Sequence, residues 1–324
     1  MKRFHDYRGL AAKDRGAAVA MGNFDGVHLG HQSVLALAHA AAAELAAPFG
    51  VVTFEPHPRS FFAPGAAPFR LMTADARARR LAKLGVEILY ELPFGAALAG
   101  LGPEVFAHDV LADGLGVRHV VVGADFRFGK GRAGDAATLT ALGHAHGFGV
   151  TIAPLICDGQ GDYSSTAIRA ALAEGRPGEA ARVLGHWHRI EGRVQHGDKR
   201  GRELGFPTAN LRLDGLNPPR FGVYAALVDV LDGPHRGRYP AAVSVGVRPT
   251  FGENAANLEA YLIDFDGDLY GAELSVALVA WLRPELKFDG VEPLAAQMRA
   301  SVEVGGRSVL QRSQAGFMSS MDPA

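Results

Sequence analysis

The sequence predicts an α/β protein in which a doubly wound parallel-sheet domain precedes a small antiparallel β-barrel domain with a C-terminal helix. In the first half, short apolar runs typical of buried strands alternate with helical segments, as in parallel sheets. From residue 189 onward, short β-rich segments follow one another with frequent turns, as in small barrels. The predicted domains are residues 1–185 and 186–302, and the structure of the tail, 303–324, is left open.

Composition narrows the class of protein. The 324 residues suffice for about two domains, and a net charge of −1 argues against a nucleic-acid binder that works by bulk electrostatics. The single cysteine, Cys157, excludes an internal disulfide framework and is expected to be a small buried hydrophobe. No apolar run follows the basic start MKRFHDYRG, and the alanine-rich segment 33–47 is too short to span a bilayer. We therefore expect a cytoplasmic protein without membrane or nucleic-acid partners.

The elements of the first half follow from the apolar runs. Strands are predicted over residues 17–21, 50–54, 86–91, 118–123 and 150–155. Helices are predicted to begin at His31, over 73–84 and 103–111, after Asp135 as N-cap, and over 164–174. Pro56 and Pro58 are expected to forbid a helix after the second strand and to force an extended exit.

The chain is organised around the segment VAMGNFDGVHLGHQSVL, residues 19–35. Gly22, Asn23 and Phe24 form a predicted turn between a strand and a helix, where free backbone N–H groups and the helix dipole attract phosphate. His28 and His31 suit a phosphoryl-type transition state because imidazoles donate hydrogen bonds or carry positive charge near neutral pH. The unit resembles the nucleotidylyltransferase signature, in which an HxGH turn holds the ATP phosphates.

Two further segments are candidates for contacts with the same phosphate-bearing ligand. The loop ADFRFGKGR offers Phe126 and Phe128 for stacking on a flat ligand, with Asp125 and several cations beside them, although it is equally explained as a charged surface loop. In YSSTAIR, Ser164 or Ser165 can cap a helix. The alternative is a second phosphate site made by the helix N-terminus, and its residues are Ser164, Ser165, Thr166 and Arg169.

Together, GNFDGVHLGH, TFEPHPR, VVGADFRFGKGRAGD and SSTAIR resemble the bacterial bifunctional riboflavin kinase/FMN adenylyltransferases, or FAD synthetases. The similarity covers residues 15–300. It implies an adenylyltransferase domain before a kinase barrel, ATP as co-substrate, Mg²⁺, and riboflavin, FMN and FAD as substrates and products that serve apo-flavoproteins downstream. One departure is Ala167, because family members commonly read SSTRIR.

The barrel carries a second group of candidate residues. Its strands are predicted over 189–195, 222–230, 241–247, 257–264 and 273–282, and its helix over 291–300. A glycine-rich basic loop could fold over a triphosphate or be an ordinary solvated hairpin, and its candidates are Gly197, Lys199, Gly201, Arg202, Gly205 and Pro207. Thr208 and Asn210 lie two residues apart on an extended chain, and such oxygen ligands suit Mg²⁺.

The resemblance places the kinase general base at Glu259, which on a strand would alternate with Leu258 and Ala260. By the residues alone Glu259 is more simply a solvent-facing side chain, with Asp264 and Asp266 as rivals for the base. Arg283 would contact flavin or phosphate, or lie on the surface before a proline turn.

Two alternative functions stay open on the sequence. One is a nucleotidylyltransferase that acts on another phosphorylated small molecule. The other is a barrel that only binds flavin, as a sensor or regulatory module.

Overall fold

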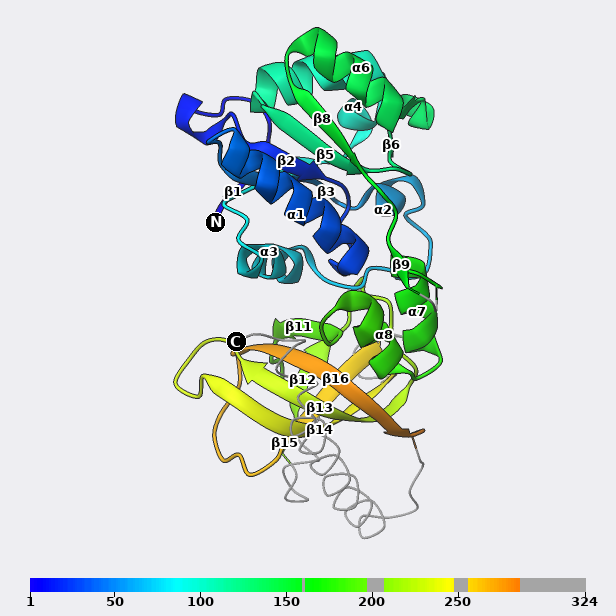
Figure 1. Cartoon of the computed structure of the whole chain (residues 1–324). Coiled ribbons are helices and arrows are strands. Elements are labelled where there is room, and N and C mark those ends of the chain that lie inside the picture. Colours follow the sequence, from blue (N-terminus) through cyan, green and yellow to red (C-terminus); the bar gives the residue numbers. More distant parts are fainter. Residues whose placement is uncertain (159–160, 197–206, 248–255, 286–324) are drawn as a thin grey trace. The chain divides into compact units, whose positions relative to one another are not determined.

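The computed structural model describes residues 1–158, 161–196, 207–247 and 256–285 (Figure 1). The chain forms two compact units. The first consists of Met1–Ala66 and Ala74–Tyr163, and the second of Ala67–Thr73 and the chain from Ser164 onward.

The first unit contains a parallel sheet with the order β1-β4-β3-β2-β5-β8, which confirms the predicted doubly wound α/β architecture. Its strands are β1 (Lys2–Phe4), β2 (Ala18–Met21), β3 (Phe49–Glu55), β4 (Ile88–Pro93), β5 (His119–Gly123) and β8 (Gly149–Ala153). Its longer helices are α1 (Leu29–Glu44), α3 (Ala74–Lys83), the π-helical segment η2 (Phe106–Leu115) and α6 (Ala136–His146). Shorter elements are η1 (Ala12–Asp14), α2 (Pro58–Phe62), α4 (Ala96–Ala99), α5 (Pro103–Val105), η3 (Lys130–Arg132) and the ribbons β6 (Arg127–Phe128) with β7 (Gly134–Asp135) and β9 (Cys157–Asp158) with β10 (Gly161–Asp162).

Both faces of this sheet are covered, which explains why its strands are continuous apolar runs. Val19 and Met21 of β2 belong to a core cluster with residues of η2 and α6. The alternate residues Ala18 and Ala20 are buried outside that cluster. Helix α1 packs against β2, β3 and β5 (Figure 1).

Three local expectations for the first unit were wrong. The edge strand β1, which pairs with β4, was not predicted because it is only three residues long. A short helix, α2, begins at Pro58, since His57 accepts a hydrogen bond from the backbone N–H of Arg59 and proline is compatible with the first helical turn. Cys157, expected to be buried, is exposed in the ribbon β9.

The second unit is an antiparallel barrel, as predicted, and its strand order is β11-β16-β13-β14-β15-β12. Its strands are β11 (Arg189–Arg193), β12 (Ala209–Arg212), β13 (Gly222–Val230), β14 (Gly237–Val247), β15 (Ala256–Leu262) and β16 (Glu273–Arg283). A bridge between Gln195 and Asn210 joins the two ends of the sheet and nearly closes the barrel. The helix predicted over 291–300 and the tail lie outside the described residues.

Helices α7 (Ser165–Ala173) and α8 (Pro177–Leu184) belong to the barrel unit, whereas the predicted boundary lies between residues 185 and 186. Ala181 of α8 packs with Trp187 and with side chains of β13 and β16. The segment 67–73 belongs here too, because Arg70 bridges to Leu216 and His188 Nε2 lies 3.1 Å from the carbonyl oxygen of Leu71.

Candidate functional sites

The turn between β2 and α1 carries the two predicted histidines. Helix α1 begins at Leu29, two residues before the expected start, because His28 is its N-cap. The Nδ1 atom of His28 accepts a hydrogen bond of 3.3 Å from the backbone N–H of His31. The ring of His28 is therefore oriented by the first turn of the helix whose positive end it occupies.

The imidazoles of His28 and His31 stack with ring centroids 3.6 Å apart and an interplanar angle of 22°. Burial, together with the neighbouring His28, holds the pKa of His31 well below its usual range. His31 is thus a neutral imidazole at pH 7, and its buried Nδ1 has no hydrogen-bond partner among the described residues. The pair provides ring nitrogens suited to a ligand that accepts hydrogen bonds.

The backbone of this turn is strained. Phe24 and Val27 have φ angles of 51° and 46°, a left-handed conformation that is uncommon for residues other than glycine. The ring of Phe24 is buried and lies 5.2 Å from that of His31, measured between centroids. A Cβ atom at Gly30 would lie 3.1 Å from His28 Nδ1, so the glycine between the histidines makes room for the stacked ring. At Gly22 a Cβ atom would meet only ordinary contact with Phe24.

The loop after β5 holds its two phenylalanines differently. The rings of Phe126 and Phe128 stack at 5.8 Å, but Phe128 is only 7% exposed and also packs against Phe106 in the core. Phe126 is the ring of this pair with more face available, and Asp125 beside it is exposed.

The SSTAIR segment opens α7, within the second unit. Ser164 is the N-cap, and its hydroxyl accepts a hydrogen bond of 3.2 Å from the backbone N–H of Ala167. Ser165 is half-buried and Thr166 is exposed at the helix N-terminus. The guanidinium of Arg169 lies 3.4 Å from the carbonyl oxygen of Phe69.

In the barrel, three polar residues share one row across neighbouring strands. Glu259 of β15 pairs in register with Asn210 of β12 on one side and with Ser244 of β14 on the other. Residues directly opposite in an antiparallel pair face the same side of the sheet. That side is the outer one, because the sequence neighbours of all three belong to the barrel core, namely Ala209, Leu211, Val243, Val245, Leu258 and Ala260. The register thus places the proposed base beside one of the two predicted metal ligands.

Hydrogen bonds orient the polar groups of this row. The side-chain Nδ2 of Asn210 donates to the carbonyl oxygen of Thr208 at 3.2 Å, and Asn210 is 7% exposed. The side-chain Nδ2 of Asn257 donates to Glu259 Oε1, also at 3.2 Å. Asp264, a rival for the base, lies beyond the end of β15 in a left-handed conformation with φ 55°.

The remaining barrel candidates are less defined. Pro207 is exposed just before β12, and Arg283 is partly buried at the end of β16. Burial, opposed by the charge of Glu285, lowers the pKa of Arg283 below its usual value. The predicted loop residues Gly197, Lys199, Gly201, Arg202 and Gly205 lie outside the described residues.

Sequence analysis overlooked several groups beside these sites. Asn257 and Ser244 adjoin Glu259. Strand alternation around Glu259 could have indicated Asn257, whereas Ser244 lies on a neighbouring strand and is placed there by register. Arg77 lies in the helix predicted over 73–84 and is absent from the predicted site residues, but it is fully buried beside the turn between β2 and α1. Its spacing of four residues from the buried Leu81 was the available signal.

Comparisons with known proteins agree with this arrangement. The family model for FAD synthetase matches residues 10–167, and that for riboflavin kinase matches residues 184–308. The bifunctional riboflavin kinase/FMN adenylyltransferase of Pseudomonas fluorescens is 43% identical over 295 residues, covering 90% of this chain and 93% of that protein. Its counterpart in Escherichia coli K12 is 39% identical, covering 89% and 91% respectively.

Among solved structures, that of a macrolide-efflux protein from Streptococcus pneumoniae has a TM-score of 0.80 at 32% identity and covers 94% of this chain and 97% of its own. Its name differs from those of the curated relatives. In the described part of the chain, no helix has the length and apolar character to cross a membrane. The two domain matches and the relatives decide between the open functions: the chain belongs to the bifunctional riboflavin kinase/FMN adenylyltransferases, which make FMN from riboflavin and ATP and FAD from FMN and ATP.

Proposed function

We propose that the turn between β2 and α1 holds ATP for the adenylyl transfer. In that step an oxygen of the FMN phosphate attacks the α-phosphorus of ATP, and the bond to the β-phosphate breaks to release pyrophosphate. His28 and His31 would donate hydrogen bonds to phosphate oxygens as charge develops on them. The backbone of Gly22, Asn23 and Phe24 would contact the nucleotide beside them. The observation that carries this assignment is the stacked imidazole pair at the start of α1, in which His28 is buried and His31 half-buried.

For the N-terminus of α7, in the second unit, we propose phosphate contacts of its own. Ser164 accepts a backbone hydrogen bond as N-cap and keeps its own O–H group as a donor, so we assign Ser164, Ser165 and Thr166 as hydroxyl donors to phosphate. Arg169 would supply positive charge one turn further along the helix.

For the kinase step, we assign the general base to Glu259. Its carboxylate would accept the proton of the riboflavin 5′-hydroxyl as that oxygen attacks the γ-phosphorus of ATP and ADP leaves. The hydrogen bond from Asn257 orients this carboxylate. Its position in register with Asn210 carries the assignment, because base and phosphate-bound ion must lie close together.

Thr208 and Asn210 fit a magnesium ion that is shared with the ATP phosphates. Both offer oxygen atoms, and Mg²⁺ is usually bound by few protein ligands together with phosphates and water. The Nδ2 atom of Asn210 donates a hydrogen bond to the carbonyl oxygen of Thr208. The amide oxygen of Asn210 is therefore the atom that would bind the cation. When bound, the ion neutralises charge on the transferred phosphoryl group.

Each unit must also bind a flavin. In the first unit we assign Phe126, backed by Phe128, with Asp125 at its rim. In the second we assign Arg283 and the glycine-rich loop to flavin or phosphate contacts.

One assay tests the two activities and the metal requirement together. Purified protein is incubated with ATP and either riboflavin or FMN, with Mg²⁺ or with a chelator, and FMN and FAD are separated. We expect both products with Mg²⁺ and none with the chelator. Formation of FMN at an unchanged rate in the chelator would contradict the metal assignment.

A further inference from the structure

Arg77 of α3 is a fully buried cation beside the turn between β2 and α1. Its Nη2 atom lies 2.7 Å from Glu91 Oε1 and 3.1 Å from Glu55 Oε2. Its Nη1 atom donates a hydrogen bond of 3.2 Å to the backbone carbonyl oxygen of Asn23. A buried guanidinium needs compensation of its charge, and the two carboxylates on Nη2 provide it.

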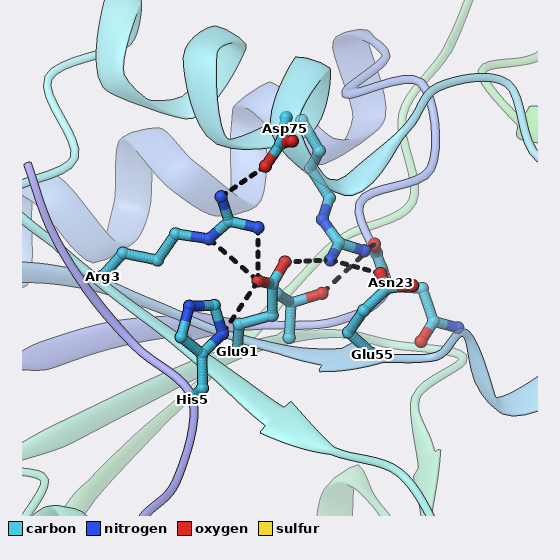
Figure 2. Close-up of polar contacts among 8 residues, drawn as sticks. Arg3, His5, Asn23, Glu55, Asp75 and Glu91 are labelled. Atoms are coloured by element: carbon cyan, nitrogen blue, oxygen red, sulfur yellow. Dashed lines mark hydrogen bonds and ion pairs between the residues drawn. The ribbon is translucent and has the colours of Figure 1, made fainter.

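The carbonyl oxygen of Asn23 receives a second hydrogen bond. The hydroxyl of Thr53, itself fully buried on β3, donates to it at 3.3 Å. Two side chains from different elements therefore hold one carbonyl group of the nucleotide-binding turn. Figure 2 shows Asn23 beside Glu55, with Arg3 and His5 on the opposite side of Glu91.

This carbonyl lies immediately before the strained part of the turn. Asn23 precedes Phe24, whose φ of 51° is left-handed and whose ring packs against His31. A strained backbone persists only where surrounding contacts hold it. The two hydrogen bonds to Asn23 are such contacts, and through Phe24 they connect to an imidazole of the HxGH pair.

Arg3, which bonds the other oxygen of Glu91, serves as a control for Arg77. The Oε2 atom of Glu91 accepts hydrogen bonds of 2.9 Å and 2.6 Å from Nε and Nη2 of Arg3, which also bonds Asp75. Arg3 and Arg77 thus share one carboxylate, but only Arg77 bonds the turn.

We propose that Arg77 and Thr53 are positioning residues for adenylyl transfer, which act by holding the carbonyl group of Asn23 and with it the Asn23–Phe24 backbone against His31. This inference rests on the assignment of the HxGH turn to the adenylyl step. It extends the machinery of that step to β3 and α3.

Thr53 gives the cleanest test, because its variants separate hydrogen bonding from packing. Thr53→Val keeps the shape but removes the donor, whereas Thr53→Ser keeps the donor but removes a methyl group. We expect Thr53→Val to raise the KM for ATP in FAD formation severalfold and Thr53→Ser to stay within twofold of the wild type. A packing role predicts the reverse order, and that order would overturn the inference.

Arg77→Lys and Arg3→Lys form the second, matched pair. A lysine can still pair with Glu91 as a point charge, but it lacks the planar fork that reaches two acceptors at once. We expect Arg77→Lys to lower kcat/KM for FAD formation about tenfold and Arg3→Lys to change it less than twofold. Equal losses in the two variants would show that only the Glu91 ion pair matters.

Two internal measurements keep these tests decisive. FMN formation from riboflavin, measured on the same preparations, should be unchanged, and thermal unfolding followed by near-ultraviolet circular dichroism shows whether each variant is folded at the assay temperature. The double variant His28→Ala/His31→Ala is assayed in parallel. If it still makes FAD, the assignment of the turn fails; if it does not, and folded Thr53→Val and Arg77→Lys retain wild-type kinetics, this inference alone fails.

Discussion

The two proposed sites are held in place by different kinds of structure. In the first unit, the histidines sit where a turn with left-handed Phe24 and Val27 meets α1, so side-chain contacts determine their position. In the barrel, Asn210, Ser244 and Glu259 lie in register on neighbouring strands, so the hydrogen bonds of the sheet determine their spacing. A substitution in the barrel row should therefore slow the chemical step without displacing neighbouring residues. A substitution in the turn should alter both substrate binding and the chemical step.

The largest expected effect is on the turn. His28→Ala together with His31→Ala should abolish FAD formation, because the two imidazoles that would donate hydrogen bonds to the ATP phosphates are removed, while FMN formation from riboflavin survives. The measurement separates FMN and FAD after incubation with ATP and Mg²⁺. Loss of both activities in a folded double variant would contradict the assignment of the two steps to separate sites.

The matching change in the barrel is Glu259→Gln, which keeps the shape and hydrogen bonding but cannot accept the ribityl proton. We expect kcat for FMN formation to fall by roughly 10²-fold or more, with riboflavin and ATP binding nearly intact. FAD formation from supplied FMN should be unaffected, because the attacking phosphate is already ionised. A near-normal rate would move the base to Asp264, and a loss of riboflavin binding would make Glu259 a ligand-orienting residue.

A smaller effect concerns stability against pH in the barrel unit. Burial lowers the pKa of His188 to about 4, and its Nε2 atom lies 3.1 Å from the carbonyl oxygen of Leu71. The unfolded chain binds a proton at this residue below about pH 6.5, whereas the folded one stays neutral until about pH 4. The unfolded state is therefore favoured as the pH falls through this window, by up to about 3 kcal/mol.

This pH effect can be isolated with His188→Gln, which keeps a donor for Leu71 but does not titrate. Denaturant unfolding at pH 7.5 and pH 5 should show a smaller loss of the free energy of unfolding in the variant. His31, whose pKa is also lowered by burial, contributes a background slope to both proteins, so the difference between them is the relevant quantity. Equal losses would show that His188 is not buried in its neutral form.

The smallest expected effect is at α7. Ala167→Arg adds a cation in the first turn of that helix and should lower the KM for ATP in FAD formation severalfold, since an exposed cation near phosphate contributes less than a well-made charge-assisted hydrogen bond. Ala167→Gln is the uncharged control. An unchanged KM in the arginine variant would indicate that Arg169 and the loop cations already suffice.

Much of the fold was predictable because hydrophobic periodicity reflects burial on one or both faces of an element. The parallel strands of the first unit appear as uninterrupted apolar runs, and those of the barrel as short segments between turns. Helix α2 was not predicted, because Pro56 and Pro58 were expected to forbid a helix. Proline nevertheless suits the first turn of a helix, where Pro58 lies. The boundary between the compact units differs from the predicted one because the packing of α7 and α8 on the barrel involves contacts that local patterns do not record.

The sequence by itself indicated the two fold classes and, through short motifs such as GNFDGVHLGH, the residues that we propose for the chemistry. Such motifs are local, since a turn, a cap and an extended pair depend on neighbours in the chain. Only the tertiary structure decided that Glu259 faces Asn210, that His31 is a half-buried imidazole with a lowered pKa and that Arg77 reaches the carbonyl group of Asn23. These features arise from strand register and from burial, which depend on residues tens of positions apart and therefore leave no mark in a local pattern.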